Sequence, residues 1–340
     1  MQSGNLPNFR VLIAFSDGLE YFTIQITHFK QIFMKQIWFW LAAFVVGLGA
    51  CKTGKVTYAP DKIVPTEKSV FWKISGNGLK KPSYLYGTIH LIPKDDFKLP
   101  VVVVDALEDS KRVAFEIDMK EMTNFRTQMS LITKSFMAGG KTLKDLLSPE
   151  DYALVKAKME EKGLPGGMFE RMKPMFLSTL FSSDEDGGTA NGGNMTSVEM
   201  ELFRASKRQQ LESTGLETAA YQMSIFDSIP YEAQAKMLVD GLRDTGSGNP
   251  DGESELDTML KLYRDQDITG MQSMISDVQY GMSKYEEILL NQRNRNWIPV
   301  MNRLMKEKPT IFAVGAGHLG GTGGVVALLR KEGYKVEVVQ

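Results

Sequence analysis

The sequence is poor in the residues that build disulfides and cysteine-rich metal sites. Its 340 residues include a single cysteine, Cys51. One cysteine cannot form an internal disulfide, and it cannot supply the several thiolates that a cysteine-rich zinc site needs. Any metal site in this chain would therefore have to be built from histidines and carboxylates.

An excess of charge of one sign is also missing. Lys and Arg number 40 against 41 Asp and Glu, which gives a formal net charge of -1. A nucleic-acid-binding surface usually needs a basic stripe, so the sequence gives no electrostatic case for a nucleic-acid partner. With 43% apolar and 24% charged residues, the composition is that of a soluble globular protein of one large or two ordinary domains.

Long apolar runs are scarce, and the clearest one is short. Residues 37–46 fall below the roughly 18–20 apolar residues that cross a bilayer. They follow a basic start at Met34-Lys35 and end in small residues, which is typical of a signal peptide. The residues Leu48-Gly49-Ala50-Cys51 resemble a bacterial lipobox, where cleavage leaves the cysteine as a lipid-modified N-terminus. The alternative is an anchor helix with an incidental cysteine. We favour the lipoprotein because the single cysteine lies where lipidation requires it.

These features divide the chain into four parts. We expect residues 1–33 to be an N-terminal extension ahead of the true start at Met34, residues 34–51 a lipoprotein signal peptide, residues 52–66 a polar linker, and residues 67–340 one α/β domain. The expected location is the cell envelope. Lipid at Cys51 would hold the protein on the periplasmic or cell-surface side of a bacterial membrane.

Histidine is scarce too, and two of the three histidines follow the same pattern. The run Tyr84-Leu85-Tyr86-Gly87-Thr88-Ile89-His90 and the run Ile311-Phe312-Ala313-Val314-Gly315-Ala316-Gly317-His318 each predict a strand, a glycine exit and then an imidazole. In open α/β sheets, ligands bind just outside the carboxyl ends of the strands. We therefore expect the two G-x-x-H loops to lie side by side, with His90 and His318 serving one site. A lone loop histidine is more often structural, but two matching loops favour a functional role.

Carboxylates near strand ends are the other candidates. Residues 112–118 predict a buried strand in which Glu116 and Asp118 share a face. Buried carboxylates need partners, so these acids either cap nearby backbone amides or face the histidine loops. Glu217, in Gly215-Leu216-Glu217-Thr218, stands where a second strand turns into a helix. It is a further acid that could face the same site.

The order of elements predicts an α/β fold. Strands are expected at 69–74, 84–86, 112–118, 210–214, 310–314 and 334–339. Helical stretches are expected at about 102–110 and over most of 148–306. The resulting prediction is a central mixed sheet flanked by helices, with a helical insertion.

Two familiar motifs do not fit. Residues 315–320 formally match G-x-G-x-x-G, but only one more strand follows, and Glu337 lies within that strand and not at its tip. We therefore reject a dinucleotide site. His90 and His318 are each followed by leucine, so H-E-x-x-H is absent. Two histidines with carboxylates would suit a divalent first-row metal such as Mn, Co, Fe or Zn.

Several segments together resemble the TraB/GumN family, which includes the TIKI proteases. The resemblance runs from about residue 70 to the C-terminus, and it is carried by Tyr86-Gly87-Thr88-Ile89-His90, Phe115-Glu116, Gly215-Leu216-Glu217-Thr218, Arg293-Asn294 and Gly315-Ala316-Gly317-His318. One such segment would be weak evidence. Five of them in this order are specific.

The resemblance implies a single α/β domain of two related halves, each giving a G-x-x-H loop, and metal-dependent peptidase chemistry with Mn or Co. By position, His90, His318 and Glu116 would bind metal. Glu116 and Glu217 would act as ligand or general base, while Arg293 and Asn294 would hold substrate or a developing oxyanion. The family often has an acid just before this arginine, where this chain has Gln292.

The expectation is a lipid-anchored, extracytoplasmic, metal-dependent hydrolase that acts on a peptide or protein substrate. One alternative is a non-catalytic lipoprotein that binds a peptide, or a metal-bearing ligand such as haem, in the same pocket. Another is a structural envelope lipoprotein with a vestigial site.

Overall fold

The computed structural model describes residues 10–15, 18–23, 54–95, 97–122, 124–182, 195–243, 255–276 and 283–339. The predicted signal peptide, with the lipobox and Cys51, lies outside the described residues. The chain divides into two units, Met1–Lys52 and Thr53–Gln340. In the first unit, strands β1 (Arg10–Phe15) and β2 (Gly18–Thr23) form an antiparallel hairpin. Within the described residues, no helix combines the length and apolar character needed to span a bilayer.

The second unit is organised around a mixed six-stranded sheet in the order β10-β3-β4-β9-β6-β8. Its strands are β3 (Phe71–Gly76), β4 (Ser83–Thr88), β6 (Arg112–Ile117), β8 (Glu212–Glu217), β9 (Thr310–Gly315) and β10 (Tyr334–Val338). Strands β4, β9, β6 and β8 are parallel, and β3 is antiparallel to both of its neighbours. The central strands β4 and β9 are buried almost throughout, as parallel strands covered on both faces must be.

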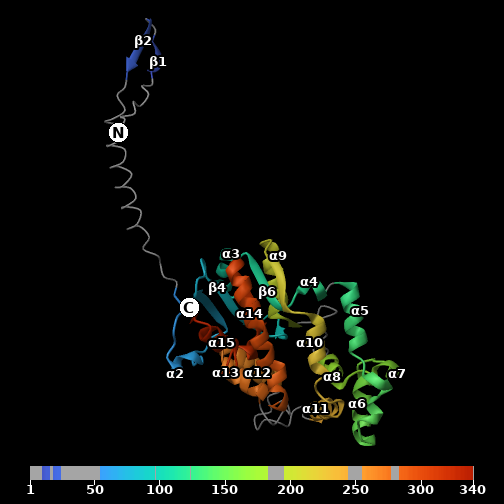
Figure 1. Ribbon diagram of the computed structural model, residues 1–340. Coiled ribbons are helices and arrows are strands. Elements are labelled where there is room, and N and C mark those ends of the chain that lie inside the picture. The colour runs from blue at the N-terminus through green and yellow to red at the C-terminus, as the bar shows by residue number, and fades with distance from the viewer. Residues whose placement is uncertain are drawn as a thin grey trace, which may run out of the picture. The chain divides into compact units, whose positions relative to one another are not determined.

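Helices cover the sheet, as the sequence predicts for an α/β fold (Figure 1). They include α3 (Val101–Asp109), α4 (Met119–Met122), α9 (Val198–Arg208), α12 (Glu255–Arg264), α13 (Ile268–Ser276), α14 (Gln292–Glu307) and α15 (Val325–Lys331). Helix α10 (Ala219–Phe226) lies toward the helical lobe, and α5 (Phe125–Lys134) lies beside it (Figure 1). Helix α14 buries Trp297, Met301 and Leu304. Their spacing of four and three residues gives it one apolar face toward the sheet.

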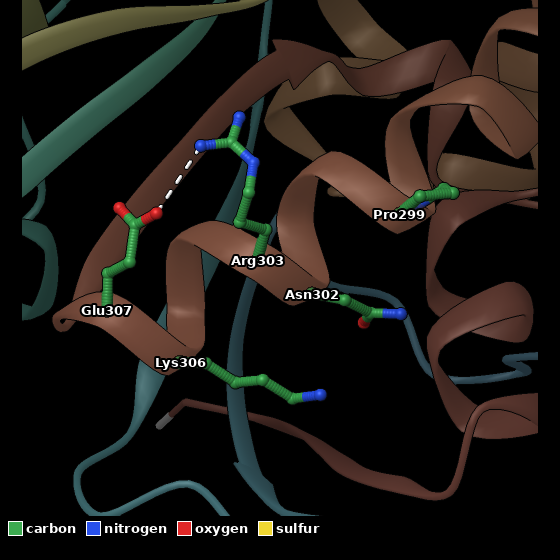
Figure 2. A pocket seen from close by; sticks show the side chains of 5 residues that line it. All are labelled: Pro299, Asn302, Arg303, Lys306 and Glu307. Carbon is green, nitrogen blue, oxygen red and sulfur yellow. Dashed lines mark hydrogen bonds and ion pairs between the residues drawn. The ribbon is translucent and has the colours of Figure 1, made fainter.

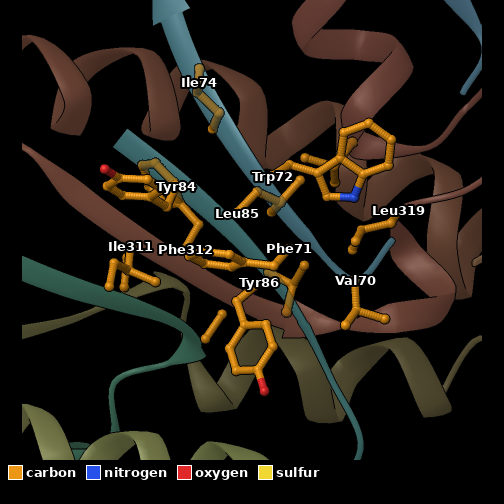
Figure 3. Packing of buried hydrophobic residues seen from close by; sticks show 14 of the residues in the cluster. Val70, Phe71, Trp72, Ile74, Tyr84, Leu85, Tyr86, Ile311, Phe312 and Leu319 are labelled. Carbon is orange, nitrogen blue, oxygen red and sulfur yellow. The ribbon is translucent and has the colours of Figure 1, made fainter. Parts of the chain in front are cut away.

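The core between sheet and helices is aromatic at its centre (Figure 3). Trp72, Tyr86 and Phe312 are almost fully buried there. Phe71 stacks on Tyr84 with ring centroids 5.6 Å apart and meets Tyr86 edge-on. These contacts fix β3 against β4, the strand that leads into the first G-x-x-H loop.

The predicted helical insertion forms a lobe with its own apolar core, seen beyond α10 in Figure 1. It contains α6 (Pro149–Glu161), α7 (Gly166–Phe169), α8 (Pro174–Ser182) and α11 (Tyr231–Arg243). Helix α6 starts as expected, with the Ser148 side chain accepting a hydrogen bond from the Asp151 amide. Helix α8 begins at Pro174, a position in the first turn where the missing N–H of proline costs no helical hydrogen bond.

Residues 54–67, which we call the strap, lie against the C-terminal end of the chain. The Val56 amide donates to the Gly333 carbonyl at 2.8 Å, and the Val336 amide donates to the Tyr58 hydroxyl at 2.9 Å. The buried Arg330 donates to the Lys62 carbonyl at 3.0 Å. The described part of the predicted linker is therefore bound to the domain, and it includes the short helix α2 (Pro60–Ile63).

Candidate functional site

The two G-x-x-H loops leave the sheet next to each other, as the sequence predicts. Strands β4 and β9 are parallel neighbours, with Thr88 paired to Gly315. A Cβ on Gly87 would come within 3.0 Å of the Leu319 side chain and 3.1 Å of Ala316 Cα. Glycine at this position therefore lets the end of β4 lie against the short 3-10 helix η5 (Ala316–His318) that carries the second histidine.

His318 is buried and neutral. Only 6% of its side chain is exposed, and Nδ1 lies 2.6 Å from Asn294 Oδ1. Asn294 Nδ2 donates to the carbonyls of His318 and Gly323, so Oδ1 is the acceptor and Nδ1 of the ring carries the proton. Burial lowers the pKa of His318 to about 3. The lone pair of the neutral ring is consequently on Nε2.

Glu116 lies at the end of β6, between the second loop and α14. Its Oε1 accepts from the Gly315 amide at 2.8 Å, and Oε2 accepts from Gln222 Nε2 at 2.9 Å and Arg293 Nη2 at 2.5 Å. Burial would raise the pKa of Glu116, but the positive charges of His318, which is protonated only at such low pH, and of Arg293 and His90 lower it to about 2. The acid thus caps a backbone amide and also faces a histidine loop.

Asp118, the other acid of this strand, is placed differently. It accepts hydrogen bonds from the Ser213 hydroxyl at 2.7 Å and the Lys120 amide at 3.1 Å. No hydrogen bond links Asp118 to the histidine loops among the described residues. Of the two acids, Glu116 is the one placed for chemistry.

Arg293 occupies the centre of the cluster, and all five of its N–H groups have partners. Nε donates to Glu217 Oε1 at 3.0 Å. Nη2 donates to Glu217 Oε1 at 2.7 Å and to Glu116, and Nη1 lies 3.1 Å from both the Leu289 carbonyl and His318 Nε2. Leu289 belongs to a π-helical turn, η4 (Glu287–Asn291), just before α14.

Two residues that the sequence analysis did not single out complete the cluster. Trp297 Nε1 donates to Glu217 Oε2 at 2.9 Å, and its ring lies 4.6 Å from the His318 ring. Gln222 Nε2 donates to both Glu116 and Glu217. A signal for Trp297 exists in the sequence, since a residue four positions after Arg293 shares its helix face. Gln292 is exposed on α14, so the departure from the family pattern faces away from the cluster.

His90, the histidine of the first loop, has a separate partner that was not predicted from the sequence. His90 Nδ1 lies 2.8 Å from Glu199 Oε1, which also accepts from the Thr88 hydroxyl at 2.7 Å. The His90 side chain is 80% exposed, whereas that of Glu199 is 13% exposed. The hydrogen bond and charge of Glu199 raise the pKa of His90 to about 9. Glu199 stands in the first turn of α9, where an acid is common for helix stability alone, so nothing in the sequence distinguishes it from other such acids.

The predicted ligands do not form a metal centre in this arrangement. The described residues hold no group of three or more His, Cys, Asp or Glu side chains placed to bind an ion. Both oxygens of Glu116 and Glu217, and Nε2 of His318, are occupied by hydrogen bonds within the cluster. His90 is bound to Glu199 instead of joining them. The residues therefore do not fit a divalent cation unless Arg293 leaves.

A shallow hollow elsewhere on α14 shares none of these groups. It is lined by Pro299, Asn302, Arg303, Lys306 and Glu307 (Figure 2). Arg303 and Glu307 form an exposed ion pair at its edge. No residue of the hollow belongs to the buried cluster, so we give it no part in the site.

Comparison with known proteins agrees with the resemblance noted above. The sequence matches the model of the TraB/PrgY/gumN family over residues 70–338. It is similar to Metalloprotease TIKI1 of Danio rerio, with 25% identity over 318 residues that cover 79% of this chain and 63% of the relative. It is also similar to Metalloprotease TIKI2 of Xenopus tropicalis, with 23% identity over 309 residues that cover 75% of this chain and 57% of the relative.

The curated relatives are longer than the region they share with this chain. Human Metalloprotease TIKI1 is 23% identical over 322 residues, which are 79% of this chain and 61% of that protein. The chain thus spans about three fifths of the length of the curated relatives it matches. No solved structure matches it significantly.

Proposed function

Because the chain belongs to the TraB/PrgY/gumN family, we propose that it is a hydrolase that cleaves peptide bonds in a peptide or protein substrate. The observation that carries the proposal is the pairing of His90 with Glu199. A buried carboxylate holds Nδ1 of an exposed imidazole, and Nε2 of that ring has no hydrogen-bond partner among the described residues. This pair stands at the carboxyl edge of the sheet, where α/β proteins bind their ligands.

The chemistry assigned to His90 is proton transfer at Nε2. In its neutral form, which predominates above the His90 pKa of about 9, the ring accepts a proton from a water molecule as that water attacks the peptide carbonyl, and it returns the proton to the departing amine. Glu199 fixes the orientation of the ring through Nδ1 and stabilises the imidazolium that forms. Glu116 and Arg293 of the buried cluster interact electrostatically with this ring.

The family also implies a metal ion. The names of the relatives describe metalloproteases, and the resemblance suggests Mn or Co, with Zn or Fe as further options. A bound metal would supply Lewis-acid activation of water. Because the candidate donors are occupied by Arg293 and its neighbours, we assign no step to a metal. Cleavage assays with chelator, Mn²⁺ or Co²⁺ measure the requirement directly.

The test is cleavage of a peptide library by the purified full chain. Measured at about pH 9 and above, where His90 is largely neutral, His90→Gln should lower the cleavage rate by about 100- to 10,000-fold, the range that general base catalysis contributes. Glu201→Gln is the matched control on the same helix and should cleave like the wild type. If no peptide is cut with or without added metal, yet peptides bind, the protein is a binder and the hydrolase proposal fails.

We also propose that Cys51 carries lipid and holds the protein in the cell envelope, on the periplasmic or cell-surface side. The support is the lipobox-like segment and the position of the single cysteine. Cys51→Ser should move the protein from the membrane fraction to the soluble fraction. Mass spectrometry that finds an unmodified Cys51 in the mature protein would contradict the proposal.

A further inference from the structure

The acids and the imidazole expected to surround a metal instead surround a guanidinium. Arg293 lies between Glu116 and Glu217, within hydrogen-bond distance of both, and 3.1 Å from His318 Nε2. Its side chain is only 9% exposed. The cation already present at this site is therefore supplied by the chain itself.

Every N–H group of Arg293 has an acceptor, and every carboxylate oxygen of Glu116 and Glu217 has a donor. The five N–H groups of Arg293 are matched by two carboxylates, one carbonyl and one ring nitrogen. The lone pair that His318 would offer a metal points at Nη1, because Asn294 holds the ring proton on the other nitrogen. The Gly315 amide donates to the other oxygen of Glu116, and Trp297 Nε1 donates to the other oxygen of Glu217. A fully matched buried network of this kind is costly to break at any one member.

We infer that Arg293 is the resident cation of this site and excludes divalent metal from Glu116, Glu217 and His318. A divalent ion bound by these three groups would lie against the guanidinium. Like charges in a buried site repel strongly, since water does not screen them there. Metal can bind only if the arginine is removed or withdrawn. The inference concerns what occupies the site, and it holds whether or not the protein cleaves peptides.

The experiment measures metal binding and not activity. The full chain is freed of metal with chelator and titrated with Mn²⁺, with free Mn²⁺ followed by its electron paramagnetic resonance signal. We expect the wild type to show no binding that depends on His318. Arg293→Met should bind Mn²⁺ at least about 100-fold more tightly than any residual binding of the wild type, because a repelling charge has gone. Adding His318→Gln to Arg293→Met should abolish the gain.

Arg295→Met is the matched control. This arginine lies two positions further along α14, is 52% exposed and pairs with Glu287, so its loss should leave Mn²⁺ binding unchanged. If Arg293→Met does not fold, the double variant Arg293→Met with Glu217→Gln removes one charge of each sign and takes its place. A wild-type protein that binds one equivalent of Mn²⁺, and loses it on His318→Gln, overturns the inference. So does a folded Arg293→Met that gains no binding.

Discussion

At the scale of single residues, two histidines in matching loops have opposite electrostatic settings. His318 is held neutral because burial opposes its charge, and its pKa falls to about 3. His90 is exposed and paired with Glu199, and its pKa rises to about 9. The two imidazoles are therefore not equivalent ligands. One is a fixed hydrogen-bond partner of Arg293, and the other is free to exchange protons.

Glu199→Gln should change the pH dependence of cleavage. A neutral amide removes the charge that stabilises protonated His90, so its pKa should fall from about 9 toward 6.5. The acid limb of the kcat/KM profile should move to lower pH, with a lower plateau because the ring is held less well. Glu201→Gln should keep the wild-type profile. Identical acid limbs in wild type and Glu199→Gln would show that Glu199 does not tune this histidine.

Arg293→Met should also destabilise the fold. It leaves two buried carboxylates without their cation, and breaking a buried ion pair costs about 3–5 kcal/mol. Urea unfolding at neutral pH should report this loss. Arg295→Met, at an exposed pair, should stay within about 0.5 kcal/mol of the wild type. Equal and small effects in the two variants would mean that the buried pairs are not stabilising.

The sequence identified most members of the site but not their partners. The resemblance pointed to His90, His318, Glu116, Glu217 and Arg293. All of these except His90 meet in one cluster. Glu199, Gln222 and Trp297 were not predicted as partners, because their contacts depend on which strand ends and helices become neighbours. Roles in metal binding or at an oxyanion remain predictions, since Arg293 and Asn294 use their donors within the cluster.

At the scale of elements, the close approach of η5 to β4 sets the position of His318. Gly87→Ala would place a Cβ about 3.0–3.1 Å from Leu319 and Ala316, so η5 must shift. Overpacking of this kind costs about 1–3 kcal/mol. Gly315→Ala is the matched comparison, because its nearest neighbours stand at 3.4 Å and 3.6 Å. Urea unfolding should rank Gly87→Ala as clearly the less stable variant, and the reverse order would contradict the packing argument.

Whether a segment forms a helix or a strand was predictable where residues close in the sequence decide its conformation. The alternating apolar runs gave the strands, and Ser148 with Pro149 gave the start of α6. The start of α8 at Pro174 is harder to predict, because a proline can either end a helix or begin one. The π-helical turn η4 was missed for a similar reason, since its sequence differs little from that of an ordinary helix.

At the scale of the whole molecule, the buried cluster should make stability depend on pH. His318 has a folded pKa of about 3 against an ordinary 6.5, so the unfolded chain binds more protons between these values. Stability should therefore fall as pH drops from about 6.5 toward 3. Glu116, lowered from 4.5 to about 2, adds stability that is lost as pH falls through that lower range.

His318→Gln should flatten the acid side of this profile, because glutamine takes up no proton on unfolding. Urea unfolding between pH 4 and pH 7 measures the slope of stability against pH. His90 acts in the other direction, since its stabilising pair with Glu199 is complete below about 6.5 and is lost as pH rises through about 9. That contribution should be small, because solvent screens an exposed ring. An unchanged acid slope in His318→Gln would show that the burial of its ring is not the cause.

The structure describes part of the domain organisation that the sequence predicts. The signal peptide and Cys51 lie outside the described residues, so these stay predictions. In the strap, Val56 and Tyr58 bond to residues near the far end of the chain. A polar, proline-containing segment gives no sign of such partners. The prediction of a polar linker therefore describes the composition of this segment, but it does not anticipate that the segment is bound to the domain.

The π-helical turn before α14 has a consequence for how the chain tolerates changes in length. A π turn holds one residue more than the α-helical turn it replaces. Losing one residue here would restore regular α-helical winding, and the residues before and after the turn would keep nearly the same direction around the helix axis. A deletion within the regular part of α14 would instead rotate everything upstream by about 100°. A one-residue deletion in the π turn, with every side chain of the cluster retained, should therefore be easier to accommodate than one in the middle of α14.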